Sequence, residues 1–425
     1  MSLLVVMAPS AASSTRAHRR PADWLFVLPS VLPACPLSSW LSIRHARRRP
    51  QAMSDPNLIV DSDFGIDDAT ALLLALRVDP NPLKAVTVVS GNVPVSRGVR
   101  NCRYLIALAD RESLGIEVYG GATAPLVPCQ PPPSQWPGHG KDGFGDASDR
   151  LPEVSSTSLH LDPPDEHAAN ALVRLVNQRP GHYRIVALGP LTNIALAITL
   201  DPDFLSKVAS IVIMGGCLFA QGNSNRTAEF NFHHDPEAAY IVFAASQRLS
   251  QQDDVQTPTG IPPAPKLTLV PWETTIRHGF AWSLFDRIQQ VSPSTPLSRF
   301  IATVAAKYQD QCRYLYDDLV KIQNMTAALT DTPSPRSVAN HHQEYIMMAN
   351  SFTMCDAYAM LVALDESLVT ESKAWNVQIE LGGQMSRGMM ALDWFSSSRQ
   401  GSNNTVVVFG MDVSALEARF LRVFA

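Results

Sequence analysis

Four aspartates, Asp61, Asp63, Asp67 and Asp68, fall within eight residues of one another in the segment 60–69. They follow a short apolar run and precede a helical pattern, so we expect a tight turn between a buried strand and a helix. Carboxylates packed this closely raise one another's pKa unless a positive charge lies among them. A hard divalent cation with oxygen ligands, Ca²⁺ or Mg²⁺, meets that requirement. The alternative is a solvated helix N-cap with spare acids, although a cap needs only one acid.

Two other acidic loops compete with this interpretation. An EF-hand loop needs acids at positions 1, 3 and 5, whereas Gly65 stands at position 5 here, so that pattern fails. Asp61-Ser62-Asp63 after an apolar strand is also similar to the start of the haloacid-dehalogenase-type phosphatases, whose first Asp is the nucleophile. That motif usually continues with Thr or Val where this chain has Gly65, and it does not require Asp67 and Asp68. A Mg²⁺-dependent phosphatase that uses Asp61 is therefore the alternative enzyme.

The elements that would position these residues alternate between strand and helix. Apolar runs predict buried strands at 57–60, 83–89, 183–187 and 210–214, and a last strand at 406–409. Helical patterns follow at 69–76, 99–109, 193–198 and 236–245, with a final helix at the C-terminus. This alternation predicts an α/β fold, an open and mostly parallel Rossmann-like sheet with helices on both faces. Ligands of such sheets bind beyond the carboxyl ends of the strands.

The charge of the chain is unevenly placed. Residues 1–53 hold seven Arg, no Lys and one acid, a balance of +6, so the formal net charge of −5 leaves −11 for residues 54–425. An Arg-rich, acid-poor N-terminus resembles a transit peptide, and a disordered tail is the alternative. We expect one domain at 54–425 and an extension at 1–53. The location is expected to be cytoplasmic, with organelle import through residues 1–53 as the alternative.

Composition excludes several classes of protein. A net charge of −5 gives no basic field for nucleic acid, and no apolar run approaches the length of a membrane span. The six cysteines show no C-x-x-C spacing, so neither a disulfide scaffold nor a Cys-based zinc site is expected. The expected partner is a small molecule.

The acidic segment resembles a known signature. Asp61-x-Asp63-x-Gly65-x-Asp67-Asp68-Ala69 is similar to the signature of the inosine–uridine-preferring nucleoside hydrolases, with Phe64 where that signature usually has proline. Further matches follow in family order at 89–92, 139–145, 188–193, 213–216, 222–223, 229–231, 235–239, 387–389 and 393–394. The resemblance covers residues 57–425.

The resemblance implies hydrolysis of the N-glycosidic bond of ribonucleosides to ribose and free base, in nucleoside salvage or catabolism, with a Ca²⁺-bound water as nucleophile. It implies that Asp63 is the general base. The implied cation ligands are Asp61, Asp63, Asp68, Asp356 and the main-chain carbonyl of Leu188. The implied ribose site comprises Asp67, Asn92, Met214, Asn223, Glu229, Phe230, Asn231 and Asp356. By analogy, the implied assembly is a dimer or tetramer.

At the group that would protonate the leaving base, the sequence departs from the better-known family pattern. Many family members carry His-Asp in the late motif, whereas this chain has Cys355-Asp356 and resembles the subset with Cys. A thiol is mostly protonated at neutral pH and can donate weakly. Alternatively, Cys355 is a small buried residue without a proton role. A non-catalytic ribose- or calcium-binding protein also remains open, as does the choice between purine and pyrimidine bases.

Overall fold

The computed structural model describes residues 57–128, 137–154, 164–256, 266–310, 351–394 and 403–424. Within it, Met53–Ala425 belongs to one compact unit. The sequence extension at 1–53 and the segment 311–350 lie outside the described residues. No helix among the described residues is long and apolar enough to cross a membrane.

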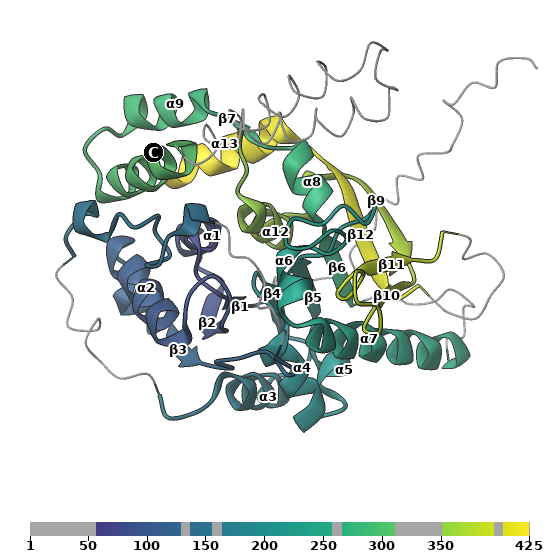
Figure 1. Cartoon of the computed structure of the whole chain (residues 1–425). Helices are drawn as coiled ribbons and strands as arrows, with labels where there is room; N and C mark the ends of the chain where they lie inside the picture. The colour runs from purple at the N-terminus through teal and green to yellow at the C-terminus, as the bar shows by residue number, and fades with distance from the viewer. Residues whose placement is uncertain are drawn as a thin grey trace, which may run out of the picture. The chain divides into compact units, whose positions relative to one another are not determined.

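Eight strands form the central sheet, in the order β3-β2-β1-β4-β5-β6-β12-β9 (Figure 1). Their bounds are β1 Asn57–Ser62, β2 Leu83–Val88, β3 Glu117–Gly120, β4 Tyr183–Ala187, β5 Ser210–Met214, β6 Leu267–Val270, β9 Val369–Trp375 and β12 Thr405–Met411. All neighbouring strands pair in parallel except β9, which runs antiparallel to β12. The predicted open and mostly parallel α/β sheet is confirmed.

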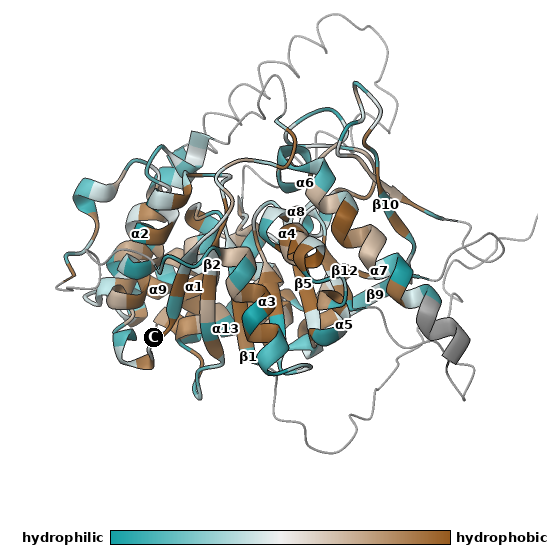
Figure 2. Ribbon diagram, turned by 90° about the horizontal axis from the view of Figure 1, so that it is seen from below, coloured by the Kyte–Doolittle hydropathy of each residue, from teal (hydrophilic) through white to brown (hydrophobic). Residues whose placement is uncertain are grey.

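Both faces of the sheet are buried, because alternate residues of a strand point to opposite sides. Leu58 and Val60 of β1 pack into one apolar core, and Ile59 packs into the other. Figure 2 shows hydrophobic residues concentrated on the strands and on the helices beside them. The near-continuous apolar runs of the sequence are therefore typical of strands that are buried on both faces of the sheet.

Helices cover the two faces in two groups (Figure 1). The first group is α1 Ile66–Leu76, α2 Val95–Leu108, α8 Trp272–Arg277, α9 Ser283–Val291, α12 Cys355–Leu364 and α13 Val413–Phe424. The second group is α3 Ala168–Gln178, α4 Thr192–Leu200, α5 Phe204–Lys207 and α7 Pro236–Gln256. A short helix, α6 Phe230–His234, precedes α7, and two small hairpins pair β7 Phe280–Ala281 with β8 Ser351–Phe352 and β10 Val377–Ile379 with β11 Met390–Leu392.

The strand order reverses at β1. The chain runs from β1 to β2 and β3 on one side, and β4 then pairs with the other side of β1. Such a switch point opens a crevice at the carboxyl ends of the strands, where α/β sheets bind ligands. Asp63 and Leu188 are the first residues beyond the ends of β1 and β4. The topology therefore places the acidic turn at this crevice.

We expect a chain shortened to Met53–Ala425 to fold with an unchanged melting temperature, because the compact unit begins at Met53 and β1 at Asn57. Calorimetry of the full and the shortened chain measures this. A chain that begins at Val60 is the matched control and should not fold, since it lacks half of a central strand. A lower melting temperature of Met53–Ala425 would show instead that the extension packs on this unit.

Candidate active site

The acidic turn between β1 and α1 is built around the carboxylate of Asp68. Ser62 Oγ donates to Asp68 Oδ1 at 2.7 Å, and the main-chain N–H of Gly65 donates to Asp68 Oδ2 at 2.7 Å. The second bond caps the start of α1, which begins at Ile66 rather than at residue 69 as predicted. Phe64 has a φ of 55°, which proline cannot adopt because its ring fixes φ at about −65°.

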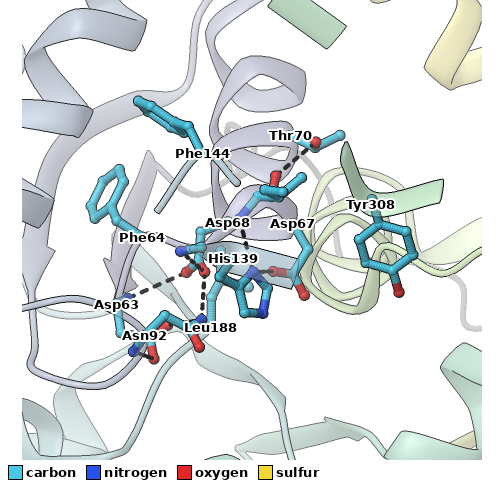
Figure 3. Close-up of polar contacts among 12 residues, drawn as sticks. Asp63, Phe64, Asp67, Asp68, Thr70, Asn92, His139, Phe144, Leu188 and Tyr308 are labelled. Carbon is cyan, nitrogen blue, oxygen red and sulfur yellow. Dashed lines mark hydrogen bonds and ion pairs between the residues drawn. The ribbon is translucent and has the colours of Figure 1, made fainter. Parts of the chain in front are cut away.

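Asp63 lies against the turn that follows β2. The N–H of Asn92 donates to Asp63 Oδ2 at 2.8 Å, and Asn92 Nδ2 donates to Asp63 Oδ1 at 3.2 Å (Figure 3). The main chain at Gly91 lies so close to Asp63 that a Cβ on Gly91 would lie 2.0 Å from Asp63 Oδ2. Only glycine therefore fits at position 91, and the Gly-Asn turn of the sequence holds the carboxylate from two sides.

Asp61 is fully buried at the end of β1. Its Oδ1 accepts hydrogen bonds from Thr87 Oγ1 at 2.5 Å and from Asn193 Nδ2 at 2.8 Å. Its Oδ2 is buried and has no hydrogen-bond partner among the described residues. The same is true of Asp67 Oδ1. Two carboxylate oxygens thus lie out of water without a donor, which is costly unless a proton or a cation compensates.

Asp356 completes the cluster from the first turn of α12. One carboxylate oxygen each of Asp67, Asp68 and Asp356 lies within 4.8 Å of the others. The Asp67–Asp68–Asp356 set differs from the predicted ligand set, in which Asp67 belonged to the ribose site. The structure therefore makes Asp67 an additional candidate for holding the same ion.

The negative charges of the aspartate cluster repel one another. Burial and then the charge of Asp68 raise the pKa of Asp67 to about 8, and burial raises the pKa of Asp61 to about 7. Burial and the neighbouring aspartates also hold the pKa values of Asp63 and Asp356 well above the usual range. A bound cation would favour the ionised forms. The oxygen-only donor set and the two unpartnered oxygens fit a hard divalent cation.

His139 lies beside the cluster and is held by the start of α1. Its Nδ1 accepts a hydrogen bond from the N–H of Ile66 at 3.1 Å, so the ring hydrogen is on Nε2 (Figure 3). Burial lowers the pKa of His139 to about 4, and the ring is therefore neutral at pH 7. Its approach to Asp67 Oδ1 at 3.8 Å is consequently not an ion pair.

The other side of the site is formed by the start of α6. Glu229 caps this helix: its Oε1 accepts from the N–H of Asn231 at 2.9 Å, and its Oε2 accepts from the N–H of Gly216 at 2.9 Å. Asn231 Nδ2 donates to the carbonyl of Leu188 at 2.8 Å and to that of Met214 at 3.2 Å. A carbonyl oxygen has two lone pairs, so Leu188 keeps one for a ligand. Burial raises the pKa of Glu229 to about 7.

Asn223 and Phe230 lie next to Glu229 and are joined to each other. The N–H of Phe230 donates to Asn223 Oδ1 at 2.8 Å. The exposed Asn223 side chain therefore has its amide nitrogen free of this bond. His233 and His234, which follow, lie in α6, and His234 packs on the ring of Phe230 with centroids 5.5 Å apart.

Cys355 begins α12 and precedes Asp356. Its Sγ lies 3.3 Å from Thr275 Oγ1, and Thr275 Oγ1 donates its one hydrogen to the carbonyl of Trp272 at 2.8 Å. The thiol is therefore the donor toward Thr275. Burial, followed by the charge of Asp67, raises the pKa of the Cys355 thiol well above its usual range. The thiol keeps its proton at neutral pH and directs it at Thr275.

The structure brings most of the predicted site residues into two adjoining groups. The acidic group contains Asp61, Asp63, Asp67, Asp68, Asn92 and Asp356. The second contains Leu188, Met214, Asn223, Glu229, Phe230 and Asn231. Cys355 adjoins the acidic group, because it precedes Asp356 at the start of α12, and the charges of Asp67 and Glu229 both raise the pKa of its thiol.

Sequence reasoning assigned no role to Thr87, Asn193 or Thr275. Asn193 stands inside a quoted motif, but nothing local to the sequence shows that its amide reaches Asp61. Thr87 has a weak signal, because it is a hydroxyl in a strand whose other residues, apart from the exposed Lys84, are apolar and buried. Thr275 has no signal in the sequence.

Comparisons with known proteins cover the part of the chain that contains this site. A family model described as inosine-uridine preferring nucleoside hydrolase matches residues 58–418. The probable uridine nucleosidase 2 of Oryza sativa subsp. japonica is 38% identical over 205 residues, 48% of this chain and 58% of that protein. The inosine-uridine preferring nucleoside hydrolase of Crithidia fasciculata is 32% identical over 261 residues, 61% of this chain and 78% of that protein.

A solved structure of an inosine-guanosine nucleoside hydrolase superposes with a TM-score of 0.67 and 30% identity, covering 86% of this chain and 98% of that one. In the sequence comparison, this chain matches 58%, 55% and 53% of the length of three plant relatives, little more than half of each.

Proposed function

Because the chain belongs to the family of inosine-uridine preferring nucleoside hydrolases, we propose that it hydrolyses the N-glycosidic bond of ribonucleosides to ribose and free base. The observation that carries this proposal is the buried aspartate cluster at the switch point of the sheet, directly beside Glu229 and Asn231. Such a reaction serves nucleoside salvage or catabolism.

The residues that would hold Ca²⁺ are Asp63, Asp68, Asp356 and the carbonyl of Leu188, with Asp61 alongside. Asp67 is added because its carboxylate lies within the same 4.8 Å set as Asp68 and Asp356. When bound, the cation lowers the pKa of a water molecule and fixes its position. The all-oxygen donor set supports a hard cation of this type over zinc.

Asp63 is proposed as the general base that takes a proton from the attacking water. Two hydrogen bonds from Asn92 fix the direction of its carboxylate. Burial and Asp68 raise its pKa in the metal-free protein, and a bound cation would favour the ionised form that accepts a proton. Gly91 maintains this arrangement, because any larger residue would displace the carboxylate.

The ribose is proposed to bind between the two groups of the site. Asp67, Asn92 and Asp356 would contact hydroxyl groups from one side, and Asn223, Glu229 and Asn231 from the other. Met214 and Phe230 would supply apolar walls. The transition state of glycoside hydrolysis carries positive charge on the sugar ring, and carboxylates held nearby in a buried site stabilise that charge.

Cys355 is proposed as the group that protonates the leaving base. Its raised pKa means that the thiol has a proton to give, but only weakly. The thiol lies 3.3 Å from Thr275 Oγ1, which already donates to Trp272, so we expect the thiol to rotate away from Thr275 before it serves the base. Because the donor is weakly acidic and must rotate, we expect it to raise the rate by a factor at the low end of the range for general acid catalysis.

The alternative phosphatase is less well supported, because Asp61 would have to act as nucleophile. It is fully buried, and its Oδ1 already accepts from Thr87 and Asn193. The remaining proposals are a homo-oligomer, either dimer or tetramer, without nucleic acid or membrane partners. The location is proposed to be cytoplasmic, with organelle import through residues 1–53 as the alternative.

Purified protein supplied with Ca²⁺ is expected to release ribose from inosine or uridine and to leave 4-nitrophenyl phosphate intact, because the site offers an activated water and a ribose grip rather than a free nucleophile. Reducing sugar and nitrophenolate measure the two reactions. Cleavage of the phosphate ester alone would support the phosphatase. Ribose binding without hydrolysis of either nucleoside would support a non-catalytic protein.

A further inference from the structure

A buried glutamate outside the proposed binding residues holds part of the loop that carries them. Glu273, in the first turn of α8 just beyond β6, is only 4% exposed. Its Oε1 accepts from the N–H groups of Leu218 at 2.8 Å and Phe219 at 3.0 Å, and its Oε2 also accepts from the Leu218 N–H at 2.9 Å. Leu218 and Phe219 belong to the β5–α6 loop, residues 215–229, which leads to Asn223 and Glu229.

The β5–α6 loop is held by hydrogen bonds at its start and by backbone hydrogen bonds of its own over residues 222–228. At its start, the carbonyl of Gly216 accepts from the N–H of Trp272 at 3.0 Å, and Glu229 accepts from the N–H of Gly216 at 2.9 Å. Near its end, the Cys217 thiol donates to the carbonyl of Thr227 at 3.2 Å. Glu273 accepts hydrogen bonds from the next two residues, Leu218 and Phe219.

Losing this carboxylate would leave the loop with unpaired polar groups. The Leu218 residue is itself buried, so its N–H has no ready access to water. A buried donor without an acceptor is unfavourable, and the loop would shift to satisfy it. Such a shift would be passed on to Asn223, whose Oδ1 is bonded to the N–H of Phe230. The ribose-contacting side of the site would then lose its shape while the aspartate cluster stayed intact.

We infer that Glu273 is a positioning residue, which holds the β5–α6 loop so that Asn223, Glu229 and Phe230 meet the ribose. This inference rests on the proposed function for its kinetic consequence, but not for its structural one. We expect the position of the acceptor oxygen Oε1 to matter most, because Oε1 accepts from both N–H groups, whereas Oε2 shares the N–H of Leu218.

Three substitutions separate geometry from charge. Glu273→Gln removes the charge and keeps an oxygen at the Oε1 position, whereas Glu273→Met keeps the length and removes both oxygens. Glu273→Asp keeps the carboxylate but moves it away from the loop by the length of one methylene group. Hydrogen exchange of the Leu218 and Phe219 amides is expected to be about 10-fold faster in the Met and Asp variants and near the wild-type rate in the Gln variant.

The kinetic readout follows the same order. With uridine or inosine as substrate, KM is expected to rise about 10-fold in the Met and Asp variants with kcat changed much less, because ground-state contacts to ribose are lost while the water-activating cluster remains. The Gln variant should keep a near wild-type KM. Melting temperatures of all variants report folding, and if the Met variant does not fold, the Asp and Gln pair decides.

Several outcomes would overturn the inference. Unchanged amide exchange in the Asp and Met variants would show that Glu273 does not hold the loop. A Gln variant that behaves like the Asp variant would show that the acceptor position alone is not sufficient, and a fall in kcat at constant KM would exclude ribose positioning. If the wild-type protein hydrolyses no nucleoside, the proposed function fails, whereas the amide exchange still tests the role of Glu273 in the loop.

Discussion

Replacing Asp63 with asparagine is expected to lower nucleoside hydrolysis by about 10²–10⁴-fold, the usual contribution of a positioned general base. Asparagine has the same shape, but it cannot take a proton from water and is a weaker cation ligand. The fold should survive, because the pKa of Asp63 is raised by burial and by Asp68, so its ionised form is unfavourable in the metal-free protein. A neutral residue at this position removes that repulsion.

The thermal response to Ca²⁺ provides the control for this variant. A ligand that binds only the folded protein stabilises it by about 2.7 kcal/mol at a concentration 100-fold above its Kd. The wild-type melting temperature should therefore rise with Ca²⁺, and that of the Asp63→Asn variant should rise less at the same concentration. Near wild-type turnover in the variant would contradict the role of Asp63 in both proton transfer and cation binding.

The central strands could be predicted from sequence because they are buried on both faces. β4 and β5 lie at the predicted residues, and β1 and β2 differ from prediction by no more than two residues at one end. β9 was missed because it is an edge strand whose middle residues, including Glu371 and Lys373, are exposed. An exposed edge strand shows no apolar run, so periodicity cannot find it. β3 and β6 were missed because each has only four residues.

Helix ends were predicted less well than strands, for local physical reasons. α1 begins at Ile66, because Asp68 caps the helix from inside its first turn through the N–H of Gly65. α7 continues to Gln256, beyond the predicted end at 245. In its later part the sequence turns polar, as expected of a helix that no longer needs to cover the sheet.

The aspartates of the acidic turn could be predicted because they are neighbours in sequence. Asp356 could be placed with them only through the family resemblance, since no local pattern links residues nearly three hundred positions apart. Hydrogen bonds such as those from Asn193 to Asp61 and from Leu218 to Glu273 depend on how the strands are ordered in the sheet. These contacts were beyond sequence reasoning for that reason.

The contact between Cys355 and Thr275 gives the role of Cys355 a sharper test. If the thiol protonates the leaving base, Cys355→Ala should lower turnover of inosine or uridine by about 10²-fold, the low end of general acid catalysis. Cleavage of 4-nitrophenyl riboside should hardly change, because its leaving group departs without a proton. Cys102→Ala, which removes a fully buried thiol in α2, is the matched control and should affect stability rather than either rate.

The contrast between the two substrates, rather than the size of either loss, decides the role of Cys355. The proposed ribose contacts and the activated water serve both substrates alike, so an equal loss on both would mean that the side chain positions Asp356 at the start of α12. Unchanged turnover of both substrates would mean that the Cys355 thiol stays bonded to Thr275 and takes no part in the reaction. The proton would then come from solvent or from a side chain that is not among the predicted site residues. A loss confined to the natural nucleosides is the one result that requires Cys355 to turn from Thr275 toward the base.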